Sequence, residues 1–236
     1  PASLNWWRTN WIDEAVDTLL TQIASLDRAD LNSELCARLP LHVVSRGVGL
    51  RSEDALTFRA HLVKSMAGHG DAPDEQKAAA ATVQQMLRDV VAARRIELCD
   101  DVVSGLIGAD FVTDEGTRKL NDEEVMGFSR HLLLAGGGTT WRQLGIAIHA
   151  LLSHYPFWEA CRADRTLVAD AVEEAVRWNA TGPVFPRLLL ADTELEGVAI
   201  PAGSRVDVCL GSGNRDPERW DDPDSFDIFR KRQAHL

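Results

Sequence analysis

The spacing of apolar residues changes at one point in the chain, and this change limits the possible folds more than any other feature. Up to Trp178 apolar residues recur at helical intervals, as they do over residues 12–23. Beyond Pro183 they alternate with polar residues, most clearly over residues 205–210, which is typical of strands. The sequence therefore predicts a mainly α fold with a small β portion near the C-terminus.

Residues that cap or break helices set the expected boundaries. Asn121 and Glu124 have the spacing of a capping box, in which each side chain bonds the amide of the other residue. Pro156 ends the long helix that begins there, and residues 68–73 and 214–224 hold too many turn formers for regular structure. We expect helices from Trp11 to about residue 23, over 30–39, from Ser52, and over 74–96, 100–106, 121–153, 157–162 and 167–178.

The composition excludes several classes of protein. A net charge of -11 over 236 residues would repel nucleic acid and anionic membrane surfaces. No apolar run reaches the roughly 18 residues that span a bilayer, and residues 1–8 do not have the pattern of a secretory signal. The four cysteines stand far apart, which fits reduced thiols better than a zinc site or disulfides: Cys36, Cys99, Cys161 and Cys209. We therefore expect a soluble cytoplasmic protein.

Three consecutive glycines, Gly136 to Gly138, lie in the middle of the longest expected helix. Each costs a helix about 1 kcal/mol relative to alanine, so something should compensate for them. The bare backbone allows close approach of another helix or of a flat ligand, and the residues alone favour helix packing. Thr139 and Thr140 follow, and their hydroxyls can bond carbonyls one turn earlier or stay available to solvent or substrate.

A possible ion pair lies on the last strong helix. Glu174 and Arg177 share one face, although Glu173 could pair with the same arginine. Such a pair contributes only about 0.2–0.5 kcal/mol when exposed, but apolar neighbours make burial plausible. A buried pair needs a further partner, which an arginine in the following segment could supply. Arg187 and His235 are isolated residues whose importance depends on a carboxylate-bearing cofactor.

Five short motifs occur in a fixed order. They are Ala-Gly-Gly-Gly-Thr-Thr at 135–140, Glu-Ala-Val-Arg at 174–177, Ile-Pro-Ala-Gly at 200–203, Asn-Arg-Asp-Pro at 214–217 and Phe-Asp-Ile at 226–228. Together, at these spacings, they resemble the cytochrome P-450 family of haem-thiolate monooxygenases, most closely its soluble bacterial members. The resemblance covers nearly the whole chain. It implies one partial domain over residues 1–236, helical over 1–180, with a β and irregular region over 181–236.

The resemblance also implies roles for individual residues. The long helix would cross the oxygen-binding side of a haem, with Thr139 as the catalytic alcohol. Glu174 and Arg177 would brace the fold on the other side of the haem. The positions that would contact the haem, through the backbone or through its propionates, are Gly136, Gly137, Arg187 and His235.

The chain departs from the family pattern at three places. Gly138 stands where the family usually has an acid that helps deliver protons to dioxygen, so Thr139 would work with water or another carboxylate. Ser225 stands where an arginine often joins the Glu174–Arg177 pair, so a different residue would complete that network. The family's cysteine-ligand loop, expected directly after His235, is absent, as is the front of the family domain. None of the four cysteines lies in a glycine loop that could replace it.

We therefore expect an internal fragment, inactive alone, of a haem-dependent monooxygenase that inserts one atom of O2 into a small organic substrate. A ferredoxin or reductase would supply electrons, drawn indirectly from NAD(P)H, and an apolar substrate is the modest expectation. Residues 230–232 form a basic cluster that is either a solvated loop or a docking site for an acidic redox protein. The alternatives are a non-catalytic helical scaffold or binding protein that keeps the fold without haem, and an unrelated all-α binding protein with coincidental motifs.

Overall fold

A computed structural model describes residues 2–66 and 73–236, and the chain divides into two compact units. The first unit ends at Trp141 and the second begins at Arg142. Of the loop expected over residues 68–73, only Pro73 lies within the described residues, as the first residue of a helix.

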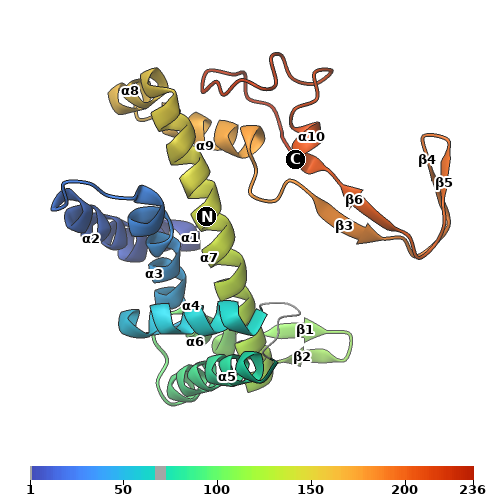
Figure 1. Cartoon of the computed structure of the whole chain (residues 1–236). Helices are drawn as coiled ribbons and strands as arrows, with labels where there is room; N and C mark the ends of the chain where they lie inside the picture. Colours follow the sequence, from blue (N-terminus) through green and yellow to red (C-terminus); the bar gives the residue numbers. More distant parts are fainter. Residues whose placement is uncertain (1, 67–72) are drawn as a thin grey trace. The chain divides into compact units, whose positions relative to one another are not determined.

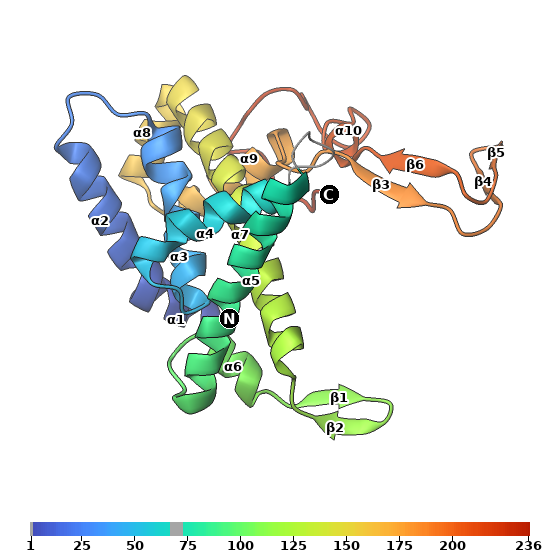
Figure 2. The same cartoon turned by 60° about the horizontal axis from the view of Figure 1, so that its bottom comes forward.

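The first unit is helical, apart from one small hairpin (Figures 1 and 2). Two of its helical segments, η1 and η2, have the wider π geometry. Its elements are α1 (Ala2–Trp7), η1 (Arg8–Ile12), α2 (Asp13–Ala24), η2 (Asn32–Cys36), α3 (Arg38–Gly47), α4 (Ser52–Met66), α5 (Pro73–Ile96), α6 (Val102–Gly108), β1 (Phe111–Thr113), β2 (Gly116–Arg118) and the start of α7 (Asp122–Ser153).

The core of the first unit forms where the apolar faces of α3, α4, α5 and α7 meet. Helix α5 shows how the sequence specifies this packing, since its buried residues recur every four positions at Ala79, Val83, Leu87 and Val91. That spacing keeps them on one side of the helix, and the charged residues between them stay exposed. The long helix predicted from this segment is confirmed.

The predicted capping box at the start of α7 is also confirmed. The Glu124 amide donates to Asn121 Oδ1, and the Asn121 amide donates to Glu124 Oε2, each at 2.9 Å. Arg118 of the preceding strand donates two further hydrogen bonds to the Glu124 carboxylate, and together these bonds lower the pKa of Glu124 to about 2. Helix α6 is capped in the same way by Asp101, which accepts from the Ser104 amide at 2.7 Å.

Two expectations for local structure were wrong, and one hairpin was not predicted. The helix expected to end at Leu39 instead consists of η2 and then α3, which continues to Gly47. Pro40 is tolerated because it lies in the first turn of α3, where a backbone N–H has no carbonyl partner within the helix. Cys209 is not on a strand but directly precedes the short helix α10, and the β1–β2 hairpin was not predicted at all.

The second unit contains the end of α7, three further helices and two antiparallel strand pairs, β3–β6 and β4–β5. The helix predicted over residues 167–178 is confirmed as α9, and the irregular segment predicted over 214–224 is also confirmed. The elements after α7 are α8 (Tyr155–Ala163), α9 (Leu167–Trp178), β3 (Phe185–Leu188), β4 (Thr193–Leu195), β5 (Val198–Ile200), β6 (Arg205–Val208) and α10 (Leu210–Gly213).

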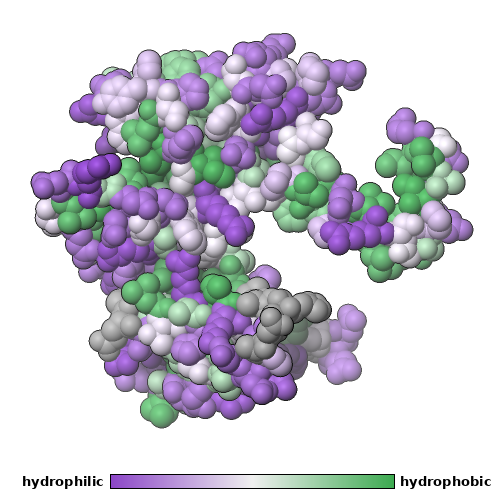
Figure 3. Space-filling view, in the orientation of Figure 1, coloured by the Kyte–Doolittle hydropathy of each residue, from purple (hydrophilic) through white to green (hydrophobic). Residues whose placement is uncertain are grey.

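The strand pairs of the second unit carry exposed apolar side chains. Glu196 and Gly197 form the two-residue turn between β4 and β5, and both have positive φ, as tight hairpin turns require. Leu195 and Val198 flank this turn, and these two residues are 58% and 62% exposed. The hydrophobic colour over these strands in Figure 3 therefore marks apolar surface that the described residues leave uncovered.

Candidate functional site

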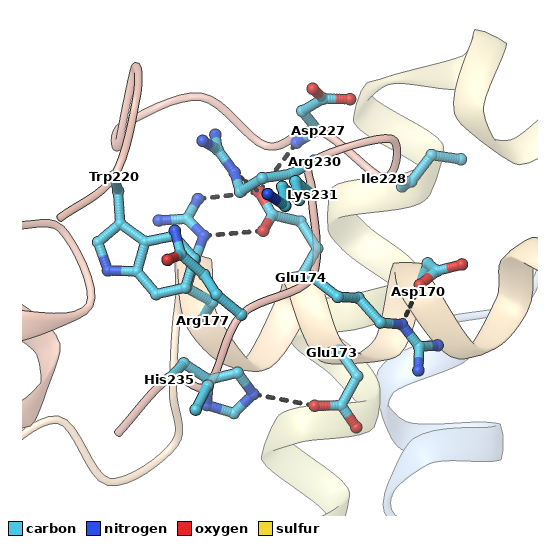
Figure 4. A pocket seen from close by; sticks show the side chains of 13 residues that line it. Asp170, Glu173, Glu174, Arg177, Trp220, Asp227, Ile228, Arg230, Lys231 and His235 are labelled. Carbon is cyan, nitrogen blue, oxygen red and sulfur yellow. Dashed lines mark hydrogen bonds and ion pairs between the residues drawn. The ribbon is translucent and has the colours of Figure 1, made fainter.

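The strongest constellation in the second unit is a buried ion pair on α9. Arg177 donates to both carboxylate oxygens of Glu174, at 2.7 Å from Nε and 2.8 Å from the second guanidinium nitrogen (Figure 4). The Arg177 side chain is 1% exposed and that of Glu174 is 6% exposed. This two-point geometry is the strong form of an arginine–carboxylate contact. The predicted Glu174–Arg177 pair is therefore present, and it is buried.

Arg177 also holds the irregular segment that follows α10. Its guanidinium donates to three backbone carbonyls, those of Asn214 and Pro223 at 2.8 Å and of Ser225 at 3.0 Å. The Trp220 ring centroid lies 5.3 Å from the guanidinium carbon, close enough for a cation–π contact. Residues 214–225 have no regular secondary structure of their own, so these contacts fix their path.

Arg230 supplies the second arginine of the Glu174 network, which the family often places at the position that is Ser225 in this chain. Arg230 Nε donates to Glu174 Oε1 at 3.1 Å, and the Asp227 amide donates to the same oxygen at 3.0 Å. Arg230 also donates to the carbonyls of Asp222 and Ser225, both at 3.0 Å. Ser225 therefore takes part through its carbonyl, while an arginine five positions later supplies the second positive charge.

These contacts keep Glu174 charged. Burial alone would raise the pKa of this carboxyl group, but hydrogen bonds from Arg177, the Asp227 amide and Arg230 outweigh it, and the pKa is lowered. A buried carboxylate surrounded by fixed donors is suited to holding backbone segments in place. With all its neighbours arranged around the charged form, it is poorly suited to exchanging protons.

The neighbouring charges of α9 bind the last segment of the chain. Glu173, the rival partner for Arg177, instead contacts His235 Nε2 at 3.0 Å, and Asp170 pairs with Arg232 (Figure 4). A cavity of about 300 Å³ lies between α9 and residues 227–235. Within the basic cluster at 230–232, Arg230 is 13% exposed and bound to Glu174, whereas Lys231 and Arg232 are exposed. The cluster is therefore not a purely solvated loop, and its role as a docking site stays a prediction.

In the first unit, the glycines of α7 differ from one another. A Cβ added at Gly136 would lie 3.0 Å from Val44 Cγ2 of α3, so here the bare backbone serves helix packing. At Gly137 and Gly138 an added Cβ would have no described atom within 4 Å, apart from the neighbouring residues and backbone of α7 itself. The Thr139 hydroxyl donates to the Ala135 carbonyl, which is one of the two arrangements expected. Close packing therefore explains one glycine, and a stretch of uncovered helix follows it.

Comparison with known proteins places the chain in a family. The family model for cytochrome P450 matches residues 70–233. The chain belongs to the cytochrome P450 family. It is 35% identical over 228 residues to the P450 monooxygenase PikC of Streptomyces venezuelae, a match that covers 95% of this chain and 53% of PikC. It is 31% identical over 225 residues to a steroid C26-monooxygenase of Mycobacterium tuberculosis, covering 93% of this chain and 59% of that relative.

Solved P450 structures share the fold. The Bacillus subtilis P450 PksS superposes with a TM-score of 0.90 at 26% identity, and the match covers 100% of this chain and 60% of that one. The Bacillus megaterium CYP109E1 complex with corticosterone gives a TM-score of 0.88 at 27% identity, covering 100% and 63%. The chain therefore has the mainly helical fold of this family and spans somewhat more than half the length of the proteins it matches.

The P450 family implies a haem, and the residues present fit part of that group. The uncovered backbone at Gly137 and Gly138 leaves room for a flat ring, since a side chain there would fill the space. Within the described part of the chain, Arg187, exposed on β3, donates only to the adjacent Pro186 carbonyl at 3.0 Å, so most of its donors remain for a carboxylate. Among the described residues, no hydrogen bond or ion pair joins Arg187 to His235.

The surroundings of the four cysteines bear on the expectation that none of them is the axial ligand of a haem, which stays a prediction. Cys36 and Cys161 are buried, and burial raises the pKa of both thiols, which disfavours the thiolate that binds iron. Cys99 and Cys209 are exposed, with only weak sulfur contacts to backbone carbonyls. Nor do the described residues bring three or more metal-ligating side chains together. Burial therefore disfavours Cys36 and Cys161 as thiolate ligands.

The sequence analysis missed two groups of residues that hold neighbouring segments of the chain together. Arg59 of α4 lies 4.5 Å above the Trp141 ring, whose Nε1 donates to Asn32 Oδ1 at 2.8 Å. Arg215 binds the Trp178 carbonyl through two nitrogens, the closer at 2.7 Å. The Asn-Arg-Asp-Pro motif was a signal for Arg215, whereas contacts between residues as far apart as 32 and 141 leave no local pattern.

Proposed function

We propose that the whole protein containing this chain is a haem-dependent monooxygenase that inserts one atom of O2 into a small organic substrate. The observation that carries this proposal is the uncovered backbone of α7 at Gly137 and Gly138, directly before Thr139, in a chain of the P450 family. When bound, the haem supplies the oxygen chemistry, and the chain supplies the pocket and the proton path.

The proposed roles follow from what each residue can donate. Gly137 would present backbone without a side chain to the cofactor, whereas Gly136 faces Val44 and could contribute through its backbone alone. The Thr139 hydroxyl would hold a proton near the reacting oxygen after giving up its bond to the Ala135 carbonyl. Arg187 would bind a propionate with its remaining guanidinium donors. For His235 to bind the other propionate, it would have to exchange its contact with Glu173.

An apolar substrate is supported by the surface of α4. Leu56 and Val63 are about 60% exposed, at 62% and 61%, and helical spacing places them on the same face as Arg59, which stacks on Trp141 of α7. One relative, of Mycobacterium tuberculosis, is named a steroid C26-monooxygenase. We therefore propose a small apolar substrate that contacts this face.

The remaining partners are proposed from the family. A ferredoxin or a reductase would deliver electrons that originate from NAD(P)H. In the described residues no helix is long and apolar enough to cross a membrane. We propose a cytoplasmic enzyme that uses neither nucleic acid nor a membrane surface as its main partner, as the charge of -11 favours.

The carbon monoxide spectrum tests this function. The whole protein, reduced under carbon monoxide, should show the Soret band of a thiolate-bound haem, and Thr139→Ala should divert electrons from product to peroxide. The 236 residues alone should not show that band, because the described cysteines are not presented as ligands. A whole protein that folds and binds no haem would favour the alternative, a non-catalytic scaffold or binding protein.

Gly138 offers a second test of the same chemistry. No acid precedes Thr139, so we propose that coupling of oxygen activation to product is weaker than in relatives with an acid there. In the whole enzyme, Gly138→Asp should lower the peroxide released per electron consumed, whereas Gly138→Asn, which fits the same space without the acid, should not. Equal peroxide release from both variants would contradict this role.

A further inference from the structure

Helices α2 and α3 of the first unit lie side by side and face each other with two polar rows (Figures 1 and 2). In each row the residues are four positions apart, which keeps them on one side of the helix. The α2 row is Glu14, Thr18 and Gln22, and the α3 row is Arg38, His42 and Arg46. Neither row takes part in the site already described.

The two ends of this arrangement are closed by direct contacts. At one end Arg46 pairs with Glu14 at 2.5 Å, and at the other Arg38 donates to Gln22 Oε1 at 2.9 Å. Arg38 also contacts Glu34 of η2 at 3.2 Å. Each guanidinium has five N–H donors, so these contacts leave donors unused on both arginines.

The middle of the arrangement is open. Over the described residues, neither Thr18 nor His42 has a hydrogen bond or an ion pair, although His42 is half-buried. Instead a cavity of about 280 Å³ lies there, bounded by the six row residues and backed by the buried Trp11 and Leu19. A hydroxyl and an imidazole therefore line the cavity between two guanidinium groups.

The unused donors around this cavity favour an anion. Arg38 and Arg46 line it, and although each is paired with a carboxylate, Glu34 and Glu14 respectively, neither pair uses all five guanidinium N–H groups. Burial, and then the charge of Arg38, lower the pKa of His42 below its ordinary value of 6.5. A cation would face two arginines here, whereas an anion would meet several unused donors.

We propose that this cavity binds a tetrahedral oxyanion, a phosphate or sulfate group. His42 and Thr18 donate hydrogen bonds to its oxygens, and the unused donors of Arg38 and Arg46 balance its charge. The site is separate from the residues proposed for oxygen chemistry, so it does not depend on the proposed function.

The site has a pH dependence with a definite sign. A bound anion raises the pKa of His42, so binding takes up a proton and tightens as the pH falls. The other charged groups facing His42 are Glu14, Arg38 and Arg46 of the two rows, with Glu34 behind Arg38. His42 is the imidazole of this site, and imidazole is the side chain whose ordinary pKa lies closest to the range from pH 6 to 8, so we assign the change in that range to it.

Calorimetric titration of the whole protein with sodium sulfate tests the site, because sulfate keeps its charge from pH 6 to 8. Chloride should hold the ionic strength constant. We expect one site that binds more tightly at pH 6 than at pH 8. His42→Gln and Arg38→Gln should each weaken binding about tenfold or more, since each removes a donor to a charged group. Thr18→Val should weaken it less, and Arg28→Gln, at an exposed loop position, should not change it.

Several outcomes would overturn the proposal. One is the absence of saturable sulfate binding. A second is equal sulfate affinity of the His42→Gln variant and the unchanged protein. A third is a loss of sulfate affinity in Arg28→Gln as large as that in His42→Gln. Thr18→Val serves as the second variant if His42→Gln fails to fold, because Thr18 lies on an exposed part of α2. Inorganic phosphate and phenyl phosphate then separate two sources of the same group. Equal affinity indicates a free ion, and tighter binding of the ester indicates a phosphorylated small molecule.

Discussion

The buried network around Glu174 and the glycine stretch of α7 are both sequence motifs of the P450 family. They differ in how many contacts their residues make with the rest of the chain. Glu174 and Arg177 find every partner they need within the second unit, including Arg230. Gly137 and Gly138 meet no described atom beyond their own helix. The charged groups of the Glu174 network are all paired, whereas the glycine stretch of α7 leaves open space beside the helix.

The contrast has a physical cause. A charge that is buried away from water needs an opposite charge or hydrogen-bond donors inside the protein, because an unpaired buried charge costs several kcal/mol. The carboxylate of Glu174 therefore needs all of its partners within the fold. Glycine in a helix costs only about 1 kcal/mol, which a fold can tolerate without any compensating contact. Complete networks therefore indicate a role in stability, and uncovered glycines indicate room for a ligand.

Removing Arg177 should have the largest effect. Arg177→Met leaves the Glu174 carboxylate with one guanidinium fewer and frees the three carbonyls that fix residues 214–225. We expect the free energy of unfolding to fall by about 3–5 kcal/mol, the usual cost of breaking a buried pair. Urea unfolding measures it, and a loss below about 1 kcal/mol, as exposed pairs give, would mean that the network is not buried.

Replacing Arg230 should have a smaller but clear effect. Arg230→Gln removes one of the two positive charges on Glu174 but leaves the two-point contact with Arg177. We expect a loss of about 1–3 kcal/mol, the range for a hydrogen bond to a charged group in a partly buried site. Arg232→Gln is the matched control, because its pair with Asp170 is exposed and contributes about 0–1 kcal/mol. Equal losses from both variants would contradict the special position of Arg230.

Much of the fold could be predicted because the signals are local. The burial of every fourth residue in α5, the capping box at Asn121 and the bounds of α9 depend on residues within a few positions of one another. Helix α3 was missed because Pro40 is a helix breaker in most positions, and only the preceding η2 turn places it where it is tolerated. The extent of a single domain over residues 1–236 stays a prediction.

The candidate site could be predicted in part. Sequence spacing identified Glu174 and Arg177, and the family comparison showed that Ser225 left a partner missing. It could not name Arg230, because that contact joins residues 56 positions apart. Nor could it separate Gly136 from Gly137, since the difference depends on where Val44 of α3 lies. The proposed roles of Thr139, Arg187 and His235 stay predictions.

Acid should weaken the Glu174 network. The pKa of Glu174 is lowered in the folded state, so its contribution is fully present above the ordinary value of 4.5 and is lost as the pH falls through the folded value. The difference in unfolding free energy between the unchanged protein and Glu174→Gln should therefore be constant near neutral pH and shrink below pH 4.5. Glu124 loses its own contribution between pH 4.5 and about 2, but it is present in both proteins and cancels. If the difference in unfolding free energy between the two proteins instead grew as the pH fell, the lowered pKa of Glu174 would be contradicted.

The smallest effect separates two adjacent glycines. Alanine gains about 1 kcal/mol over glycine in a helix, so Gly137→Ala should stabilise the chain by nearly that amount, because the added Cβ meets nothing. Gly136→Ala should gain less or lose stability, since its Cβ would lie 3.0 Å from Val44 Cγ2. In a Val44→Ala background the two substitutions should become alike. Thermal unfolding of the four variants measures this, and equal effects in both backgrounds would show that the contact with Val44 does not constrain α7. If a haem covers Gly137 in the whole protein, Gly137→Ala should stabilise the haem-free form and weaken haem binding, a reversal that packing alone does not produce.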